Sequence, residues 1–366
     1  MQAVILVGGE GTRLRPLTST VPKPVVPLVD RPLIVFMLEW LRRHGVDEVV
    51  LCCGFLPTKV QDVLGDGSAL GLRLDFIAEP EPLGTGGALK YAESRLDERF
   101  LMLNGDVLTD LDLTAQIAQH EATGAQGTLA LVGVDDPTAY GLVRLEADNA
   151  VREFVEKPSA DQVDTNLISA GAYVLERTVV DRIDAGRAVS IEREVWPALV
   201  GNGLYGFPCE AFWSDIGTPD RYLQATFDII EGRIDTAVGA RLGGDYMEVG
   251  GSVENAGRIV PPAVVEDGCR IAAGAQIGSL AVLGRGVSVG AGTVIERSVV
   301  LAGSEIGEGC VLRDCIVAPG GRIGANTQIT GGAVLGENVS IGSDNVITNG
   351  ARIFPGVSLP DGGIRF

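Results

Sequence analysis

The sequence predicts an α/β protein of two domains, an N-terminal domain with a mixed sheet followed by a C-terminal left-handed parallel β-helix. Two observations lead to this prediction. Short apolar runs alternate with helical patterns up to about residue 230, and from about residue 260 apolar residues recur every six positions. The length of 366 residues also exceeds what one ordinary core needs. We therefore expect residues 1–235 to form the first domain, 236–262 a linker and 263–366 the β-helix.

In the first domain, the apolar runs predict buried strands that end in glycine-containing turns. Val4–Val7 runs into Gly8-Gly9, and Phe100–Leu103 runs into Asn104-Gly105-Asp106. The apolar spacing of Pro32–Arg43 predicts a helix between strands. This alternation is typical of βαβ units and of a Rossmann-like sheet, whose ligands bind beyond the carboxyl ends of the strands. Both turns are therefore candidate parts of a binding site.

The six-residue period of the C-terminal part predicts a parallel left-handed β-helix of hexapeptide repeats. Each six-residue unit of this fold forms one flat side of a triangular coil, and its apolar residue points into the prism. Two one-residue slips separate the periodic residues into two groups: Val265, Ile271, Ile277, Leu283, Val289 and Ile295, and then Val317, Ile323, Ile329, Leu335, Ile341, Ile347, Ile353 and Leu359. A glycine-rich linker would not keep this phase.

Charge and composition exclude several classes of protein. The net charge of −19 argues against nucleic-acid binding, which needs basic patches to neutralise phosphates. No stretch approaches the ~20 apolar residues of a membrane span, and the N-terminus lacks the basic start and long apolar run of a secretory signal. The six cysteines form no CxxC pair, which predicts reduced thiols, and only two histidines are present. We therefore expect a cytoplasmic protein without a histidine-rich zinc site or a histidine-based mechanism.

The segment after the first predicted strand has the features of a phosphate-binding loop. The glycines Gly8-Gly9 and Gly11 allow backbone N–H groups to approach phosphate oxygens closely. Arg13 and Lys23 follow, and residues 12–29 contain no acidic residue. The loop is neither a Walker A motif, which needs Gly-Lys-Ser/Thr, nor a dinucleotide fingerprint, which needs a third glycine. An ordinary turn with basic flanks is the plainer alternative.

Residues 8–18, followed by Pro22-Lys23-Pro24, resemble the opening motif of the sugar-nucleotide pyrophosphorylases. Four further motifs follow in the order of this family: Leu83-Gly84-Thr85-Gly86-Gly87-Ala88, Asn104-Gly105-Asp106, Phe154-Val155-Glu156-Lys157-Pro158 and Trp213-Ser214-Asp215-Ile216-Gly217-Thr218-Pro219. Many members carry a left-handed β-helix at the C-terminus, so the resemblance covers essentially the whole chain. It implies a nucleotidyltransferase that joins a nucleoside triphosphate to a sugar 1-phosphate and releases pyrophosphate.

The resemblance also implies a role for each motif residue. The nucleotide-binding residues are Leu6, Gly8, Gly9, Gly11, Thr12, Arg13, Glu79, Gly84, Thr85, Asn104 and Asp106. The sugar-phosphate-binding residues are Gly141, Glu156, Lys157, Ser169 and Gly171. Catalysis is implied for Arg13, Lys23 and Asp106, and the cofactor Mg²⁺ is implied to bind Asp106 and Asp215. Plainer roles stay open, namely a turn residue and a helix cap for the two aspartates, a surface ion pair for Glu156 with Lys157, and an ordinary turn for Tyr140-Gly141.

The chemistry of the implied reaction suits this set of residues. The nucleophile is an oxygen of the sugar 1-phosphate, which is already an anion, so its attack on the α-phosphorus needs no general base. Positioning and fixed positive charge should then supply most of the catalysis. Mg²⁺ prefers hard oxygen ligands and is usually held by one or two carboxylates together with substrate phosphates.

Glu79, five residues before Gly84, favours GTP as the nucleotide. Guanine offers two adjacent N–H donors, which suit the two oxygens of a carboxylate. Uracil and thymine instead suit the glutamine that family members using UTP or dTTP commonly carry. A solvated glutamate in an acidic run is the alternative.

Residues 103–108 and the tail 359–365 look most like mannose-1-phosphate guanylyltransferases, which makes GTP and mannose 1-phosphate the leading pair of substrates. One departure concerns the sugar. Members of that group usually have Asn-Ala-Gly where this chain has Ser169-Ala170-Gly171, so another hexose 1-phosphate or a cyclitol phosphate stays open. Asn166 lies nearby in the sequence but out of register.

Other functions are weaker matches to the sequence. A glucose-1-phosphate thymidylyl- or uridylyltransferase is the first alternative. A regulatory subunit that binds sugar nucleotide without turnover should have lost part of the loop or a metal carboxylate, and all of these residues are present. An acyltransferase β-helix commonly uses a catalytic histidine, and none follows His120. We expect the β-helix to mediate assembly of a homo-oligomer instead.

Overall fold

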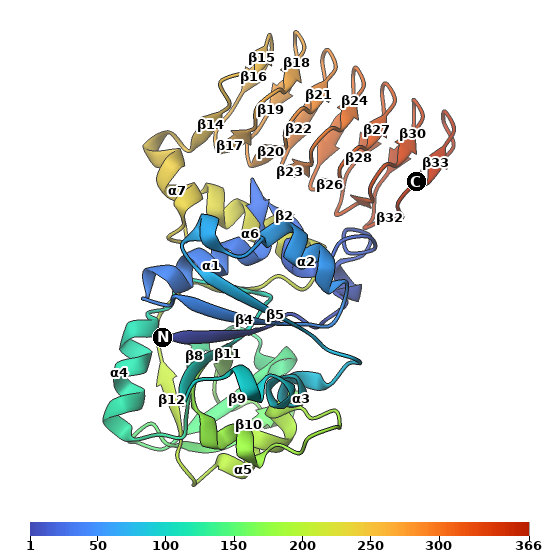
Figure 1. Ribbon diagram of the computed structural model, residues 1–366. Helices are drawn as coiled ribbons and strands as arrows, with labels where there is room; N and C mark the ends of the chain where they lie inside the picture. Colours follow the sequence, from blue (N-terminus) through green and yellow to red (C-terminus); the bar gives the residue numbers. More distant parts are fainter. Residues whose placement is uncertain (366) are drawn as a thin grey trace. The chain divides into compact units, whose positions relative to one another are not determined.

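The computed structural model describes residues 1–365, which form two compact units (Figure 1). Unit 1 contains residues 1–10 and 34–213. Unit 2 contains residues 11–33 and the described chain from Ser214 onward. The segment 236–262, which the sequence analysis expects to be a linker, contains a helix and the first strands of the β-helix. The domain limits themselves stay a prediction.

Unit 1 is built on a nine-stranded sheet. Its strands are β1 Gln2–Leu6, β4 Glu48–Cys53, β5 Arg73–Ala78, β6 Arg99–Asn104, β8 Gly127–Gly133, β9 Gly141–Leu145, β10 Val151–Glu156, β11 Leu167–Glu176 and β12 Leu204–Pro208. The order is β10-β9-β11-β6-β1-β4-β5, with β8 beside β11 and β12 beside β8. β1 is parallel to β4 and β6, whereas β11 is antiparallel to β6, β8 and β9. The predicted mixed sheet is therefore confirmed.

The predicted apolar runs form the centre of this sheet. Val4 and Ile5 of β1 and Phe100 and Leu101 of β6 are fully buried. Strands with apolar residues on both faces are expected where a sheet is covered on both sides. The two strands that precede the candidate binding turns are therefore rigid, buried supports.

Five helices belong to this part of the chain: α1 Leu33–Arg43, α2 Pro57–Leu64, α3 Gly84–Tyr91, α4 Leu113–Thr123 and α5 Trp196–Leu199. The helix predicted over 32–43 is confirmed as α1, which begins one residue later. Trp40 of α1 is buried, and its indole N–H donates to the Leu111 carbonyl at 2.9 Å. Helix α4 begins at an Asp112 cap, whose carboxylate accepts from the Ala115 N–H at 3.0 Å. None of the helices described within residues 1–365 combines the length and the apolar composition that a membrane span requires.

Unit 2 contains a parallel β-helix made of three sheets of short strands. The first sheet consists of β14 Met247–Val249, β17 Ala263–Val265, β20 Ala281–Leu283, β23 Ser298–Val300, β26 Ile316–Val317, β29 Val334–Leu335 and β32 Arg352–Ile353. The second consists of β15 Glu254–Asn255, β18 Arg270–Ile271, β21 Ser288–Val289, β24 Glu305–Ile306, β27 Arg322–Ile323, β30 Ser340–Ile341 and β33 Ser358–Leu359. The third consists of β16 Arg258–Ile259, β19 Gln276–Ile277, β22 Val294–Glu296, β25 Val311–Arg313, β28 Gln328–Ile329 and β31 Val346–Ile347.

The periodic apolar residues line the interior of this β-helix, as predicted. All fourteen pack in one apolar cluster, in which only the last two, Ile353 and Leu359, are partly exposed. The two slips are also confirmed, because Val300 follows Ile295 by five positions and Val317 follows Leu312 by five positions. The hexapeptide phase therefore sets which side chains form the core.

The first sheet of the β-helix also buries its outer face. The outward side chains Val264, Val282, Val299, Ile316 and Val334 are at most 2% exposed. Helix α6 (Pro219–Ile230), also in unit 2, runs beneath these strands in Figure 1, and its Phe227 ring lies 4.9 Å from the Arg297 guanidinium. Helix α7 (Ala237–Leu242) follows it and leads into β14. This apolar outer face ties the segment after Ser214 to the β-helix.

Truncating an inward residue should destabilise the β-helix. Ile329 is completely buried, so Ile329→Ala should lower the free energy of unfolding by about 2–5 kcal/mol through lost burial and a cavity. Gln328→Ala, one position away on the exposed outer side, should change it by less than about 0.5 kcal/mol. Urea titration of the two variants checks this, and equal stabilities would contradict the inward assignment.

Candidate functional site

The two turns at the carboxyl ends of β1 and β6 lie side by side in unit 1. β1 and β6 are parallel neighbours, and Leu6 pairs with Asn104. The Gly105 N–H donates to the Leu6 carbonyl at 3.0 Å, and a side chain on Gly105 would collide with Val7. This close packing brings the glycines after β1 next to the Asn-Gly-Asp turn, at the edge where parallel sheets bind ligands.

Glu79 directly follows β5 and points at the glycines after β1. Its Oε1 lies only 2.7 Å from where a Cβ of Gly8 would be, and its Oε2 accepts from the Leu83 N–H at 3.3 Å. Burial raises the pKa of Glu79 above its ordinary value, although the Leu83 N–H lowers it in part. A half-buried carboxylate beside a glycine backbone suits recognition of a ligand better than a solvated surface position does.

The glycines at the start of α3 have a packing role as well as the expected ligand role. A Cβ on Gly84 would lie 2.6 Å from the Val189 carbonyl, and one on Gly87 would lie 2.8 Å from the Arg187 carbonyl. The Gly86 N–H donates to the same Val189 carbonyl at 2.9 Å. The glycines thus let the segment 187–189 lie directly against the helix, which places the following residues beside Thr85.

Glu192 is a candidate site residue that the sequence motifs do not indicate. It lies in a π-helical turn, Ile191–Val195, and its Oε2 accepts from the Thr85 hydroxyl at 2.8 Å and from the Ser190 hydroxyl at 2.7 Å. Burial and, next, the charge of Glu192 raise the pKa of Glu156 above its ordinary value. The two carboxylates therefore face a common region next to the nucleotide-side loop.

The expected sugar-phosphate residues come together at the β9–β10 hairpin. Gly141 pairs with Glu156 across the two strands, and the Lys157 N–H donates to the Tyr140 carbonyl at 2.9 Å. Gly141 cannot carry a side chain because the Phe154 ring lies across its Cα. The motif at 154–158 and the Tyr-Gly turn are therefore one structural unit.

Ser169 and Gly171 on β11 complete the same region. The Ser169 hydroxyl lies 3.0 Å from the buried Tyr173 hydroxyl. Gly171 has φ of +73°, and a Cβ there would lie 2.9 Å from Nδ2 of Asn104. Within residues 1–365, Oδ1 of Asn104 is buried and has no hydrogen-bond partner. A buried acceptor without a protein partner at a strand end can accept a hydrogen bond from a ligand or from water.

Trp213 connects this region to the motif that contains the second expected metal ligand. Its indole N–H donates to the Ala170 carbonyl at 2.8 Å, and its ring meets the Tyr140 ring edge-on with centroids 5.1 Å apart. Asn166, on the other hand, lies against Gly133 rather than among these residues. In unit 1, contacts join the Asn104 turn, the hairpin at 140–157 and Trp213, whereas residues 11–18 and 214–219 of the first and last motifs belong to unit 2.

The cationic part of the glycine-rich loop belongs to unit 2. Gly11 has φ of +62°, and its carbonyl accepts from the Thr18 hydroxyl at 2.7 Å. A 3-10 helix, Thr12–Leu14, follows with Arg13 exposed. Lys23 is 9% exposed and packs its aliphatic chain against Gly11. The fold therefore places a nearly buried lysine and an exposed arginine on one short loop.

Arg13 and Asp215 lie beside the same glycine in unit 2. A Cβ on Gly217 would be 3.0 Å from Nη2 of Arg13 and 3.1 Å from Oδ2 of Asp215. Asp215 also forms an ion pair with Arg221 of α6. No group of three or more His, Cys, Asp or Glu side chains gathers in the described part of the chain to hold a metal by itself.

The fold and these strand-end motifs define a nucleotide-binding α/β protein with a C-terminal β-helix. The chain belongs to the nucleotidyl transferase family, because the model of that family matches residues 2–232. Residues 259–361 match the model of the GMPPB C-terminal domain.

Relatives extend over the full chain. The chain is 38% identical to a mannose-1-phosphate guanylyltransferase of Mycobacterium tuberculosis, covering 100% of this chain and 98% of that protein. It is 34% identical to mannose-1-phosphate guanylyltransferase 1 of Arabidopsis thaliana, over 97% of this chain and 96% of that protein. Among solved structures, HddC from Yersinia pseudotuberculosis complexed with GMP-PN is 29% identical, with a TM-score of 0.53 over 62% of this chain and 97% of that chain.

Proposed function

We propose that this chain condenses GTP with a sugar 1-phosphate, with mannose 1-phosphate as the leading acceptor, to give a GDP-sugar and pyrophosphate. The full-length relatives that carry the name mannose-1-phosphate guanylyltransferase support this proposal. The single observation in the structure that supports it most is the half-buried carboxylate of Glu79, held beside Gly8 at the end of β5. Its two oxygens match the adjacent N1–H and N2–H donors of guanine.

The proposed reaction is a displacement at the α-phosphorus. An oxygen of the sugar 1-phosphate forms the new P–O bond, and the bond to the bridging oxygen of the β-phosphate breaks as pyrophosphate leaves. Both reactants are anions, so the main barrier is electrostatic and positional. Arg13 and Lys23 supply fixed positive charge, while the backbone around Gly8 and Gly11 leaves room for phosphate oxygens.

Mg²⁺ fits the acidic residues of the proposed site. Asp106 and Asp215 offer hard carboxylate oxygens, and no cluster of three ligands occurs within residues 1–365. This donor set matches Mg²⁺, which is usually held by one or two carboxylates plus substrate phosphates. When bound, the ion offsets charge on the phosphates. Asp215 must exchange its ion pair with Arg221 for such a ligand, so that Arg221 tunes its availability.

The sugar pocket is proposed to lie among Glu156, Glu192 and Lys157. The two carboxylates accept hydrogen bonds from sugar hydroxyls, and Lys157 pairs with the sugar phosphate. The Ser169 hydroxyl already lies in hydrogen-bond contact with Tyr173. Glu192 offers a charged acceptor to a sugar hydroxyl, whereas Ser169 offers only a neutral hydroxyl.

The test of the proposed function is pyrophosphate release with Mg²⁺ from GTP, dTTP, UTP, ATP or CTP and a panel of sugar 1-phosphates. Turnover with GTP and mannose 1-phosphate is the expected result. Preference for dTTP or UTP would overturn the assignment of the nucleotide. Turnover with GTP and a different sugar phosphate would retain the nucleotide and correct the sugar.

Glu79→Gln should shift the nucleotide preference. An amide offers one donor and one acceptor, so kcat/KM for GTP should fall by about 10- to 100-fold while that for UTP or dTTP falls less or rises. Glu81→Gln, an exposed change in the same acidic run, is the matched control and should behave as wild type. An unchanged GTP preference in the Glu79 variant would contradict the carboxylate's role.

The same residue predicts the sign of a pH effect. Because burial raises the pKa of Glu79, its carboxylate takes up a proton at a higher pH than an exposed glutamate does. The acceptor for guanine is then lost as pH falls, so KM for GTP should rise on acidification and the Gln variant should lack this dependence.

Location in the cytoplasm and assembly through the β-helix stay predictions, which cell fractionation and light scattering can test.

A further inference from the structure

The glycine-rich loop is built onto the β-helix unit. Residues 11–33, which carry Arg13 and Lys23, cluster with the chain from Ser214 onward and not with the sheet of unit 1. The sequence places the loop directly after β1 of that sheet, so its position in unit 2 comes from tertiary contacts made by residues more than 180 positions later.

The loop segment from Arg15 to Thr20 contacts two coils near the C-terminal end of the β-helix. The Thr20 hydroxyl donates to Oε2 of Glu337 at 2.7 Å. Nη1 of Arg352 donates to the carbonyl of Arg15 at 2.8 Å. Arg15 and Thr20 lie just after Arg13 in the acid-free segment, so these two contacts restrain the part of the loop that presents the guanidinium.

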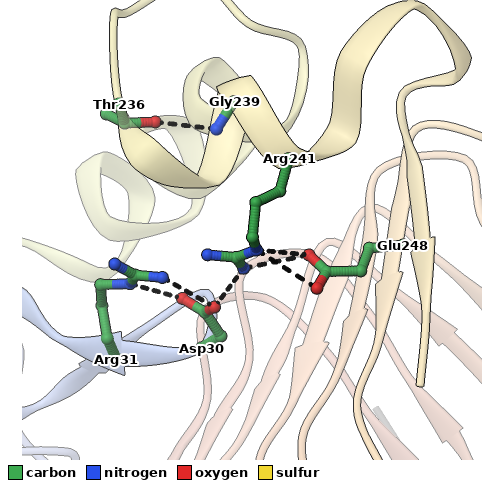
Figure 2. Close-up of polar contacts among 6 residues, drawn as sticks. All are labelled: Asp30, Arg31, Thr236, Gly239, Arg241 and Glu248. Carbon is green, nitrogen blue, oxygen red and sulfur yellow. Dashed lines mark hydrogen bonds and ion pairs between the residues drawn. The ribbon is translucent and has the colours of Figure 1, made fainter. Parts of the chain in front are cut away.

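The other end of the loop is held at the start of the β-helix, as Figure 2 shows. The Asp30 carboxylate accepts from the Arg31 guanidinium at 2.8 Å and pairs with Arg241 of α7, which also reaches Glu248 of β14 at 3.0 Å. Burial alone would raise the pKa of Asp30, but the two guanidinium groups hold it below its ordinary value. The Asp30 carboxylate therefore stays charged and paired.

A hydrogen bond from α6 adds to this hold. The Tyr222 hydroxyl donates to the Pro27 carbonyl at 2.6 Å, within the small hairpin formed by β2 (Pro27–Leu28) and β3 (Arg31–Pro32). The hairpin end of the loop is thus held by the buried Tyr222 and by a network of partly exposed ion pairs, while the segment between Arg15 and Thr20 depends on contacts with the outer side of the coils.

We propose that Glu337 and Arg352 are positioning residues of the nucleotidyl transfer: they fix the segment between Arg15 and Thr20 so that Arg13 meets the triphosphate in one orientation. Fixing a flexible glycine-containing loop before the substrate arrives removes an ordering cost that would otherwise weaken binding. The inference rests on the proposed function of the loop.

Glu337 and Arg352 do not form the core of the β-helix. Glu337 follows the inward residue Leu335 by two positions, at a corner of the coil, and Arg352 points outward from β32. Removing their side chains opens no cavity among the inward residues, so the fold should tolerate the change. A kinetic effect can therefore be separated from unfolding.

The experiment compares Glu337→Ala, Arg352→Ala and the double variant with two matched controls. Glu308→Ala changes a glutamate that also stands two positions after an inward residue but at a different corner of the coil, and Arg322→Ala changes an arginine in the same Arg-Ile pattern of another strand; within the described chain neither control residue has a polar contact with residues 11–33. The double variant should raise KM for GTP about tenfold, with KM for the sugar 1-phosphate nearly unchanged and the thermal midpoint within about 2 °C of wild type. Both controls should match wild type.

Conservative replacements give a second readout. Glu337→Gln keeps an acceptor for the Thr20 hydroxyl, so it should restore most of the affinity for GTP. Thr20→Val should have little further effect in the Glu337→Ala background, because the shared hydrogen bond is already gone. Additive effects of these two changes, or Glu337→Gln behaving like Glu337→Ala, would overturn the positioning role.

Arg13→Ala in the same assay distinguishes a failure of the positioning role from a failure of the proposed function of the loop. Loss of activity in Arg13→Ala together with wild-type KM for GTP in the Glu337/Arg352 double variant overturns the positioning role alone. Full activity in Arg13→Ala overturns the proposed function of the loop and this inference with it. Loss of activity in Arg13→Ala, a raised KM for GTP in the double variant and rescue by Glu337→Gln support the proposal.

Discussion

Arg13→Ala should lower kcat/KM for the nucleotidyl transfer by about 10²- to 10³-fold, the range expected when one charged donor to a transferring phosphoryl group is lost. Arg13 is exposed on the 3-10 helix Thr12–Leu14, and its guanidinium lies beside Gly217 with the Asp215 carboxylate. Because the Arg13 side chain is exposed, the loss should appear in turnover and not in stability. Steady-state pyrophosphate release and thermal unfolding of the same preparation measure the two quantities.

Arg13→Lys is the informative companion to this variant. Lysine keeps the charge but not the planar pair of donors that a guanidinium offers to a phosphate. We therefore expect an activity between those of the alanine variant and wild type. Wild-type kinetics in both variants would overturn the proposed role of the loop at the triphosphate.

The β-helix could be predicted because its signal is local in sequence. Each flat side of the coil places one residue inward every six positions. The spacing of Ile323, Ile329 and Leu335 therefore predicts that they point inward, without information from distant residues. The six-residue period predicts no inward residues between Ile295 and Val317, because two five-residue sides shift the phase there. The coil tolerates a short side because the stacked strands still pair, as Val300 with Val317 shows.

The strand-end turns could also be predicted from the sequence, since a buried apolar run followed by glycine indicates both the strand and its end. The place of Glu192 could not be predicted, because its hydrogen bond with Thr85 depends on packing of the segment 187–189 on the glycines of α3. Likewise, Thr20 and Glu337 are 317 positions apart, and neither has a neighbouring pattern that indicates the other. Side chains joined only by tertiary packing leave no periodic trace in a single sequence.

The side-chain amide of Asn104 shows what the structure adds to a residue that a sequence motif indicates. The sequence places Asn104 at a strand end with the aspartate that follows it two positions later. The structure adds that Gly171 approaches the amide of Asn104 so closely that no side chain fits, and that Oδ1 has no hydrogen-bond partner within residues 1–365. The orphaned oxygen faces a position that only a ligand or a water molecule can satisfy.

Asp106→Asn should reduce turnover by about 10²- to 10³-fold and should raise the Mg²⁺ concentration needed for half-maximal activity. An amide oxygen is a weaker ligand for a hard cation than a carboxylate oxygen, and the variant also loses the negative charge that attracts the ion. Asp106 stands two positions after the end of β6 and outside the strand, so the substitution leaves the sheet intact. Activity across a MgCl₂ titration measures both effects.

Asp97→Asn is the matched control, because Asp97 is exposed just before the opposite, amino end of the same strand and should not change the Mg²⁺ requirement. Comparison with Asp215→Asn tests whether the two proposed ligands act together. Asp215 already pairs with Arg221, so its replacement also frees a guanidinium, and part of its effect should be independent of Mg²⁺. If Asp106→Asn instead kept the wild-type rate and Mg²⁺ dependence, the carboxylate after β6 would be a turn residue and the metal would have to be held by Asp215 and the substrate phosphates.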